Sequence, residues 1–469
     1  MAQNFLPCDR DQELLLPPSL REWLPDDHLA WFVLDAVDQL DLERFYAAYR
    51  RDGWGAAAHE PRMMVALLVY AYSIGVRSAR GIERRCREDV AFRVITANQV
   101  PDHATIARFR ARHEQAIGEL FNGVLELCAE AGLVRVGVVA VDGTKIEANA
   151  SHRAVRSYDQ IVEEILADAA ETDAREDELF GEARGDELPV ELSTTGQRRA
   201  RLLEAKRRLD QKRAAEAEPV PRDRCVRLRE CKRRLEEDLQ LERATIVEHE
   251  AWLERGIASD GSRRMVGARA RVKPYPLPDR PIGAINVTDP DARKLRSSFH
   301  ALTGYNAQAV VGEGQIVIAA EVTVETSDLS QLEPMITKAR EELAAVGIDD
   351  LPEVVVADAG YWQQHGIQEL VNQGMQTLVP PDAHKRRGPR PGRRGGIYDF
   401  MRRVLATDHG TALYKKRQAL VEPVFAQTKW NRSAARFQRR GRAAAQSEWR
   451  LLTATHNLLK LHKHQLATA

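Results

Sequence analysis

The chain has 469 residues, 43% of them hydrophobic and 29% charged, a composition typical of a globular protein with two or three domains. Its 69 basic and 69 acidic residues cancel, so the net charge indicates no class of partner. Five cysteines without C-x-x-C spacing argue against a zinc ribbon or redox dithiol, and the lack of a signal pattern or membrane-length apolar run predicts a soluble, cytoplasmic protein with no membrane partner.

The first part of the chain, residues 1–135, is predicted to be helical. Two of its short helices carry several arginines: SARGIERRCRED, with Ser78 as N-cap, and DHATIARFRARHEQ, with Arg108 and Arg110. Short helices, tight turns and arginines are typical of a helix-turn-helix-like DNA reader. The alternative is a solvated arginine face on a helical bundle.

The stretch VRVGVVAVDGTKIEA (134–148) is the first clear strand, and it places Asp142 at the end of an apolar run. A charged side chain there is costly unless something requires it. The following residues, 152–256, are charged and helix-favouring, with apolar residues at helical spacing, Leu166 among them, on both sides of a Pro219–Pro221 turn. This pattern predicts an inserted antiparallel helical hairpin whose apolar stripes pack against each other.

Strands then resume and alternate with helices. A hairpin is predicted first and a β–α–β crossover second, which suits a mixed sheet with helices on both faces. The predicted strands are 304–311, 315–324, 351–362 (ending in Asp358) and 375–381, with a helix at 329–347 after the hairpin.

Towards its end the chain becomes basic. Residues 384–450 contain 18 Lys and Arg against 4 Asp and Glu, an excess of 18 − 4 = +14. A predicted helix, YKKRQALVEPVFAQTKW (414–430), carries Glu422, and 448–464 is a final amphipathic helix. A Pro/Gly/Arg loop precedes them and begins with the basic run Lys385, Arg386 and Arg387.

Asp142, Asp358 and Glu422 are candidate partners in one site. Converging carboxylates repel one another and protonate unless a cation joins them. With no cysteine or histidine beside them, these oxygen ligands favour Mg²⁺ or Mn²⁺. Two such ions about 3.5–4 Å apart activate a water or a 3′-hydroxyl and stabilise the leaving oxygen of a phosphodiester, while the basic segment binds the polyanion. Taken singly, each acid has an ordinary alternative as a cap, a turn former or a surface ion-pair partner.

Three motifs, DGTKIEANAS, VVVADAGYW and YKKRQALVEPVFAQTK, resemble those of the DDE-type transposases of bacterial insertion sequences. The resemblance implies a ribonuclease-H-like catalytic core, a mixed sheet flanked by helices in the α/β class, and assigns the catalytic and metal-binding roles to Asp142, Asp358 and Glu422. It also places the family's Tyr–Arg–Glu–Lys signature on Tyr414, Arg417, Glu422 and Lys429. Four residues separate Arg417 from Glu422, where the commoner pattern has three.

The resemblance extends to the N-terminal helices, which are similar to a family domain to which binding of the terminal inverted repeats is attributed. It implies a DNA-binding domain at 1–133, a catalytic domain at 134–469 and a helical insertion at 152–272. The implied activity is hydrolysis at the transposon ends, followed by attack of the freed 3′-hydroxyl on target DNA. Joining two ends requires at least two protomers, and the substrate implies a nucleoid-associated protein.

Two competing functions remain open: an inactive protein that only occupies transposon ends, and a metal-dependent nuclease that never joins. Lys429 lies seven residues from Glu422, near two helical turns, and is expected to contact a phosphate near the cut. The tryptophans Trp362, Trp430 and Trp449 are candidates for stacking on a flipped base, although core packing is the favoured interpretation for each. The candidate DNA-binding residues are Tyr414, Arg417, Lys429, Lys385, Arg386, Arg387, Arg108 and Arg110.

Overall fold

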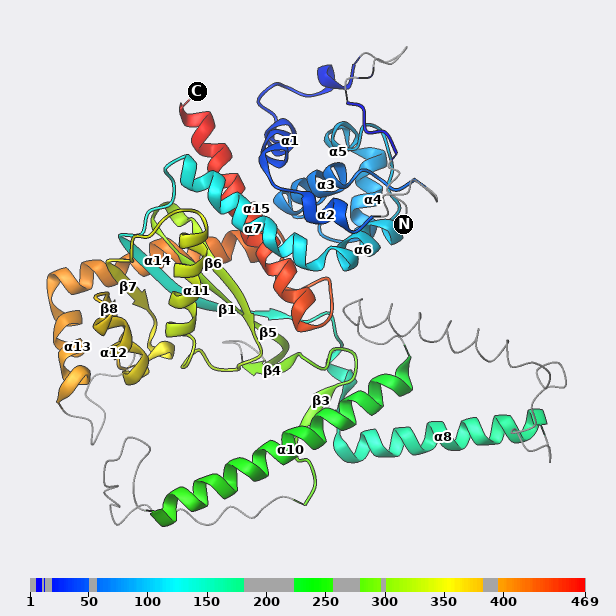
Figure 1. The fold of residues 1–469 in the computed structure, drawn as a ribbon, viewed down its shortest axis with the longest axis vertical. Helices are drawn as coiled ribbons and strands as arrows, with labels where there is room; N and C mark the ends of the chain where they lie inside the picture. Colours follow the sequence, from blue (N-terminus) through cyan, green and yellow to red (C-terminus); the bar gives the residue numbers. More distant parts are fainter. Residues whose placement is uncertain are drawn as a thin grey trace. The chain divides into compact units, whose positions relative to one another are not determined.

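The computed structural model describes residues 6–10, 12, 19–49, 57–180, 223–255, 279–296, 301–382 and 395–468. The chain divides into two compact units: a main unit of residues 1–149 and 293–469, and an inserted unit of residues 150–292 (Figure 1). Within the described ranges, no helix has both the length and the apolarity that crossing a membrane requires.

The first part of the main unit is a helical region built around α3 (Pro61–Ser73). Every residue of this helix except Arg62 is buried, which makes it the centre of the region. The predicted N-cap at Ser78 is confirmed, because its side chain accepts a hydrogen bond from the backbone N–H of Gly81. The elements are η1 (Leu20–Trp23), α1 (Leu29–Gln39), α2 (Glu43–Ala47), α3 (Pro61–Ser73), α4 (Ala79–Glu88), α5 (Val90–Ile95), α6 (His103–Arg112) and α7 (Glu114–Glu130).

A mixed sheet forms the second part of the main unit, as the strand pattern predicted. Its order is β4-β5-β1-β7-β8, with β6 also paired to β5. The long strand β5 is antiparallel to its neighbours, whereas β7 is parallel to β1 and β8 is parallel to β7. All four residues of β7 are buried, as expected for a parallel strand covered on both faces. The strands are β1 (Val138–Glu147), β4 (Arg293–Arg296), β5 (Ala301–Val311), β6 (Val317–Thr323), β7 (Val354–Ala357) and β8 (Gln376–Leu378).

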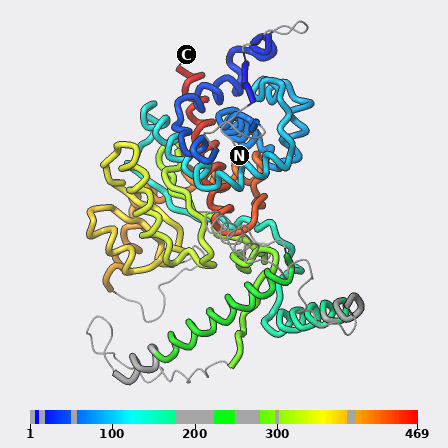
Figure 2. The backbone as a smooth tube through the Cα atoms, turned by 45° about the vertical axis from the view of Figure 1, so that its right-hand side comes forward, coloured from blue at the N-terminus to red at the C-terminus, as the bar shows by residue number. Residues whose placement is uncertain are grey.

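Helices from the second half of the chain pack on this sheet. Helix α14 lies against β1 and β7, and α15 packs on β6 and runs alongside α7 (Figures 1 and 2). The predicted helix around Glu422 is present as α14. It begins earlier than predicted, at Asp408, and continues through Pro423 into a π-helical turn. The helices are α11 (Leu332–Ala345), α12 (Gln364–Asn372), α13 (Gly396–Ala406), α14 (Asp408–Ala426), the π-helix η6 (Gln427–Asn431) and α15 (Arg442–Thr468), with short turns η4 (Glu313–Gln315) and η5 (Ala359–Tyr361).

Amide side chains of α15 cover the free edge of β6. Asn457 accepts a hydrogen bond from the N–H of Val317 at 2.8 Å and donates to the same residue's carbonyl at 2.7 Å. Further along β6, Gln446 accepts a hydrogen bond from the N–H of Val322 and donates one to the carbonyl of Ala320. The edge that would otherwise present unpaired backbone groups is thereby satisfied within the chain.

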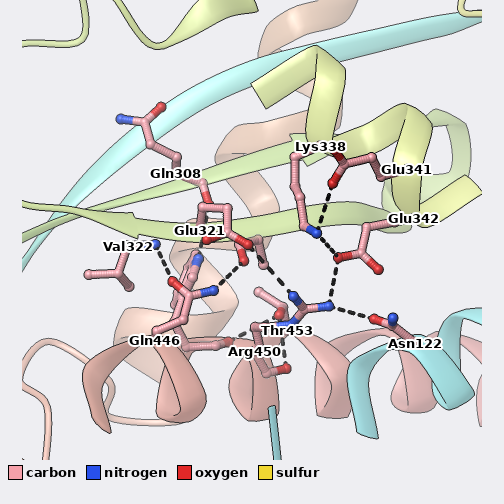
Figure 3. Close-up of polar contacts among 12 residues, drawn as sticks. Asn122, Gln308, Glu321, Val322, Lys338, Glu341, Glu342, Gln446, Arg450 and Thr453 are labelled. Carbon is pink, nitrogen blue, oxygen red and sulfur yellow. Dashed lines mark hydrogen bonds and ion pairs between the residues drawn. The ribbon is translucent and has the colours of Figure 1, made fainter. Parts of the chain in front are cut away.

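A buried ionic cluster fixes α15 to its neighbours (Figure 3). Arg450 donates to Asn122 on α7 and to Glu342 on α11, and its other terminal nitrogen lies 3.6 Å from Glu321 on β6. Lys338 lies 3.2 Å from Glu342, whose side chain is only 3% exposed. Each buried charge therefore has a partner of opposite sign, which is the condition for tolerating it in the interior.

The inserted unit contains η2 (His152–Ala154), β2 (Val155–Ser157), α8 (Tyr158–Phe180), α10 (Arg224–Arg255) and β3 (Ala284–Asn286). Its core joins the two helices to β3 through Ile161, Leu228, Cys231, Leu235 and Ile285. The interpretation of the apolar stripes as internal packing holds for Ile161, Leu228, Cys231 and Leu235. It is wrong for Leu166, which is 64% exposed because it lies on the side of α8 away from this core.

Candidate functional site

Asp142 and Asp358 lie at the same level of neighbouring parallel strands, Asp358 directly after the end of β7 and Asp142 within β1, which continues to Glu147. The register pairs Val141 on β1 with Ala357 on β7, so each aspartate is the next residue of its chain. Each is oriented by a glycine N–H: Asp142 accepts from Gly143 at 2.8 Å and Asp358 from Gly360 at 2.8 Å. The parallel register of β1 and β7 therefore brings the two aspartates to the same level of the sheet.

Arg417, on α14, connects this edge to the third acid. Its Nη1 donates to Oδ2 of Asp142 at 2.7 Å, and its Nη2 lies 3.6 Å from Oε1 of Glu422. The guanidinium also lies over the ring of Tyr414, 6.0 Å from its centre, because residues three apart share a helix face. The arginine and Asp142 are 13% and 17% exposed, whereas Glu422 is 56% exposed.

The electrostatics of the site follow from burial and crowding. Burial raises the pKa of Asp142 to about 6, against the lowering effect of Arg417 and with a further raising contribution from Asp358. Burial also acts to lower the pKa of Arg417, but Asp142, Tyr414, Asp358 and Glu422 outweigh it and the pKa rises. All three candidate acids therefore act on this one guanidinium.

In the part of the chain that the structure describes, no three Asp, Glu, His or Cys side chains lie close enough together to hold a metal ion. Asp142 and Glu422 both face Arg417, which supplies the positive charge beside them. Their chemistry nevertheless suits a hard divalent cation: the donors are carboxylate oxygens, and a cation beside Asp142 would favour the ionised form that burial disfavours.

Lys429 lies on η6 and points to β1. Its Nζ donates to the backbone carbonyl of Lys145 at 2.8 Å, three residues beyond Asp142. Burial lowers the pKa of Lys429, with a smaller contribution from the charge of Lys145. The lysine is thus beside the site, and in this arrangement it binds the protein's own backbone.

The remaining DNA-binding candidates differ in accessibility. Arg108 on α6 is exposed. Arg110, the other DNA-binding candidate on this helix, is 7% exposed and donates to the hydroxyl of Tyr72 and the carbonyl of Arg77, so its guanidinium belongs to the interior of the helical region. The basic run Lys385, Arg386 and Arg387 lies outside the described residues.

The three tryptophans also differ. Trp362 and Trp449 are 5% and 0% exposed, in agreement with core packing, and Trp449 donates its indole N–H to the carbonyl of Gln308. For Trp430 core packing was the wrong interpretation, because its side chain is 79% exposed on the π-helical turn η6.

Sequence reasoning missed one further acid near the two aspartates. Asp328 accepts hydrogen bonds from Lys145, Asn306 and Gln308. The available signal was the pair of polar residues, Asn306 and Gln308, inside the otherwise apolar strand GYNAQAVV, where they are fully buried. Polar side chains in a buried strand require partners, and an acid in the loop after the next strand was a candidate.

Two family models match the chain. One, described as "Transposase domain (DUF772)", covers residues 18–112, and the other, described as "Transposase DDE domain", covers residues 397–462. The second spans Tyr414 to Lys429 and most of α15, whereas Asp142 and Asp358 lie outside both matched segments. No curated protein and no solved structure matches the chain.

Proposed function

The chain belongs to the DDE-type insertion-sequence transposases, and on this premise we propose that it cuts DNA at the terminal inverted repeats of its element and joins the freed 3′ ends to target DNA. One observation carries the proposal: Arg417 contacts both Asp142 on β1 and Glu422 on α14, which are far apart in the sequence. Asp358 also raises the pKa of this arginine. The antiparallel pair β5–β6 followed by parallel β1, β7 and β8 supports a ribonuclease-H-like core.

The proposed cofactor is a pair of Mg²⁺ or Mn²⁺ ions held by Asp142, Asp358 and Glu422. When bound, the ions would activate the attacking oxygen and stabilise the leaving oxygen of the phosphodiester. Asp142 has to be ionised for this role, and the hydrogen bond from Arg417 favours the ionised form. The guanidinium of Arg417 would also bind a DNA phosphate beside these acids, in a geometry that arginine favours.

The proposed division of labour follows the chain. The helical residues 1–133 bind the terminal repeats, the catalytic domain spans 134–469, and 152–272 is its helical insertion. Double-stranded DNA is the partner, at least two protomers act together, and the site of action is the nucleoid in the cytoplasm.

Several basic side chains and one tyrosine are assigned to the phosphates. Arg110 is left out of this set because it is buried. Lys429 joins the set only if DNA draws it away from the carbonyl of Lys145. The assigned residues are Arg108, Lys385, Arg386, Arg387, Tyr414, Arg417 and Lys429.

Cleavage of a labelled duplex that carries the element's terminal repeat tests the proposal. In Mg²⁺, Asp142→Asn, Asp358→Asn and Glu422→Gln should each reduce cleavage by ~10³-fold or more, while binding of the same duplex in Ca²⁺ is retained. Asp350→Asn is the matched control, because Asp350 is an exposed acid in the loop before β7. Wild-type cleavage by Asp142→Asn would contradict the assignment.

The joining step needs a separate assay, with pre-cut ends and a plasmid target. Joined product supports a transposase. Cleavage without joining would instead identify a nuclease, and binding of the ends with neither reaction would identify a protein that only occupies them.

A further inference from the structure

Asp328 and three partners form a polar cluster that the proposed chemistry does not use. Oδ1 of Asp328 accepts from Asn306 at 2.6 Å, from Gln308 at 2.8 Å and from the ammonium of Lys145 at 3.1 Å. The cluster is defined here as Asp328, Lys145, Asn306 and Gln308. Because Asp328 is paired with a cation, it adds less net negative charge beside Asp142 than an unpaired acid would.

The cluster lies behind the strand that carries Asp142. Gln308 is the cross-strand partner of Gly143, and Asn306 is the partner of Lys145. Side chains alternate along a strand, so these residues share the face of β1 opposite to Asp142. Asn306 and Gln308 are fully buried, and Oδ1 of Asn306 has no hydrogen-bond partner among the described residues. Such burial is costly and calls for a specific reason.

The cluster lies directly against Gly143, the residue whose N–H orients Asp142. A Cβ atom at Gly143 would lie 2.2 Å from Nε2 of Gln308 and 2.9 Å from Oδ1 of Asp328, so any larger residue would require these side chains to shift. The N–H of Gly143 is the group that donates to Asp142. Movement of the cluster therefore moves the donor that fixes the first aspartate.

The same cluster also touches the loop of the second aspartate. Tyr361, three residues after Asp358, donates its hydroxyl hydrogen bond to Gln308. A Cβ at Gly360 would lie 3.8 Å from Cβ of Asp328, and the N–H of Gly360 is the donor to Asp358. One partly buried cluster thus contacts both the segment of β1 that carries Asp142 and the loop that carries Asp358.

We infer that Asp328 is a positioning residue for the two-aspartate half of the site. Together with Lys145, Asn306 and Gln308, it fixes the two peptides whose N–H groups orient Asp142 and Asp358. The inference rests on the proposed function, since it presupposes that the two aspartates bind divalent ions. Residues that orient metal ligands typically change metal affinity or activity by about 10–100-fold when replaced.

The first test compares Asp328→Asn with Glu325→Gln. Glu325 lies in the same loop, is exposed and undergoes the same loss of charge, which makes it a matched control. Mn²⁺ binding to the DNA-free protein is measured from the electron paramagnetic resonance signal of free Mn²⁺. Asp328→Asn should weaken binding by about tenfold, and Glu325→Gln should leave it unchanged. In cleavage assays the half-maximal Mn²⁺ concentration should rise for Asp328→Asn, with excess Mn²⁺ restoring the rate, a response that a merely structural defect would not give.

A second test disturbs the cluster without removing a charge. Gly143→Ala forces Gln308 and Asp328 away from β1, and it should weaken Mn²⁺ binding to a similar extent. Gly137→Ala is its control, because a Cβ at Gly137, just before β1, would meet nothing closer than 3.8 Å.

The outcomes separate this inference from the function on which it rests. Wild-type Mn²⁺ affinity in Asp328→Asn and Gly143→Ala, with affinity lost in Asp142→Asn, would overturn the positioning role alone. Wild-type affinity in Asp142→Asn as well would overturn the metal site and the positioning role together.

Discussion

Arg417 donates a hydrogen bond to Asp142 over 2.7 Å, although 275 positions separate the two residues in the chain. The same guanidinium lies 3.6 Å from Glu422, and the charge of Asp358 contributes to raising its pKa. A single arginine thus provides the counter-charge for acids that would otherwise repel one another. The fold itself therefore places a cation, the guanidinium of Arg417, beside these acids.

Arg417→Gln should destabilise the metal-free protein. It leaves the mostly buried Asp142 without its cation, and we expect a loss of about 2–3 kcal/mol in the free energy of unfolding in EDTA. Mn²⁺ should raise the melting temperature of this variant more than that of the wild type, because added positive charge relieves the repulsion. Thermal unfolding with and without Mn²⁺ measures both effects.

The control for that prediction is Lys416→Gln. Lys416 is adjacent in the chain, half-exposed, and only 3.6 Å from the partly exposed Glu313, so its loss should change stability by less than about 0.5 kcal/mol. Equal melting temperatures for wild type and Arg417→Gln in EDTA would contradict the counter-charge role of Arg417.

A second buried ion pair joins the N-terminal helices to α15. Arg77 lies 2.9 Å from Glu448, with side chains 4% and 1% exposed, and Arg77 also donates to the carbonyl of Arg436 at 2.9 Å. Arg77→Met should lower the free energy of unfolding by about 3–5 kcal/mol, because it leaves a buried carboxylate unpaired. Urea denaturation followed by tryptophan fluorescence measures the change.

Two further variants isolate the cause of that loss. Adding Glu448→Leu to Arg77→Met should recover much of the stability, since no unpaired charge then remains. Arg84→Met, which breaks an exposed pair with Glu88, should change stability by no more than about 0.5 kcal/mol. A small effect of Arg77→Met alone would show that the pair does not connect the two regions.

The relation between Asp142 and Asp358 was predictable from sequence, whereas their surroundings were not. Two apolar runs that each end in an aspartate predicted that the two acids lie side by side in a mixed sheet, and the register of β1 and β7 agrees. The Asp328 cluster depends on cross-strand register between β1 and β5 and on a loop after β6. No local sequence pattern predicts that β1, β5 and the loop after β6 come together, so the cluster is seen only in the folded chain.

Charge counting does not show which basic side chains reach solvent. The excess of basic residues in 384–450 predicts a segment that binds the polyanion, and two of its arginines have partners within the protein. Arg439 pairs with Glu114, and Arg432 is 3% exposed and donates to the carbonyl of Leu452. A sequence count assigns each charge to solvent, because it cannot see which partners the fold supplies.

Buried His456 should make stability depend on pH. Its pKa is lowered to about 3, by burial first and then by Arg432, while its ring hydrogen-bonds to the carbonyl of Gln315. Because the folded pKa lies below the unfolded value, the unfolded chain binds the proton, and stability present above about pH 6.5 is lost as the pH falls. Between about pH 7.5 and about pH 5 this one group should remove roughly 2 kcal/mol.

Comparison with His456→Gln isolates this contribution, since glutamine keeps a donor and does not titrate. The difference in unfolding free energy between wild type and variant should shrink by roughly 2 kcal/mol over that pH interval. Other titrating groups, including the buried His113, act in both proteins and cancel. Parallel pH profiles would show that His456 does not stay neutral in the folded protein.

Salt dependence of DNA binding tests which basic residues meet phosphates. Each phosphate contact contributes about −0.9 to the slope of log K against log salt for duplex DNA, because it releases condensed counterions. Replacing Lys385, Arg386 and Arg387 together by alanine should therefore reduce the steepness of the slope by up to about 2.7 units. Arg439→Gln should leave the slope unchanged, since that arginine is 17% exposed and already paired with Glu114. Titrations of a labelled end duplex at several salt concentrations give the slopes, and an unaltered slope in the triple variant would remove the basic run from the DNA-binding surface.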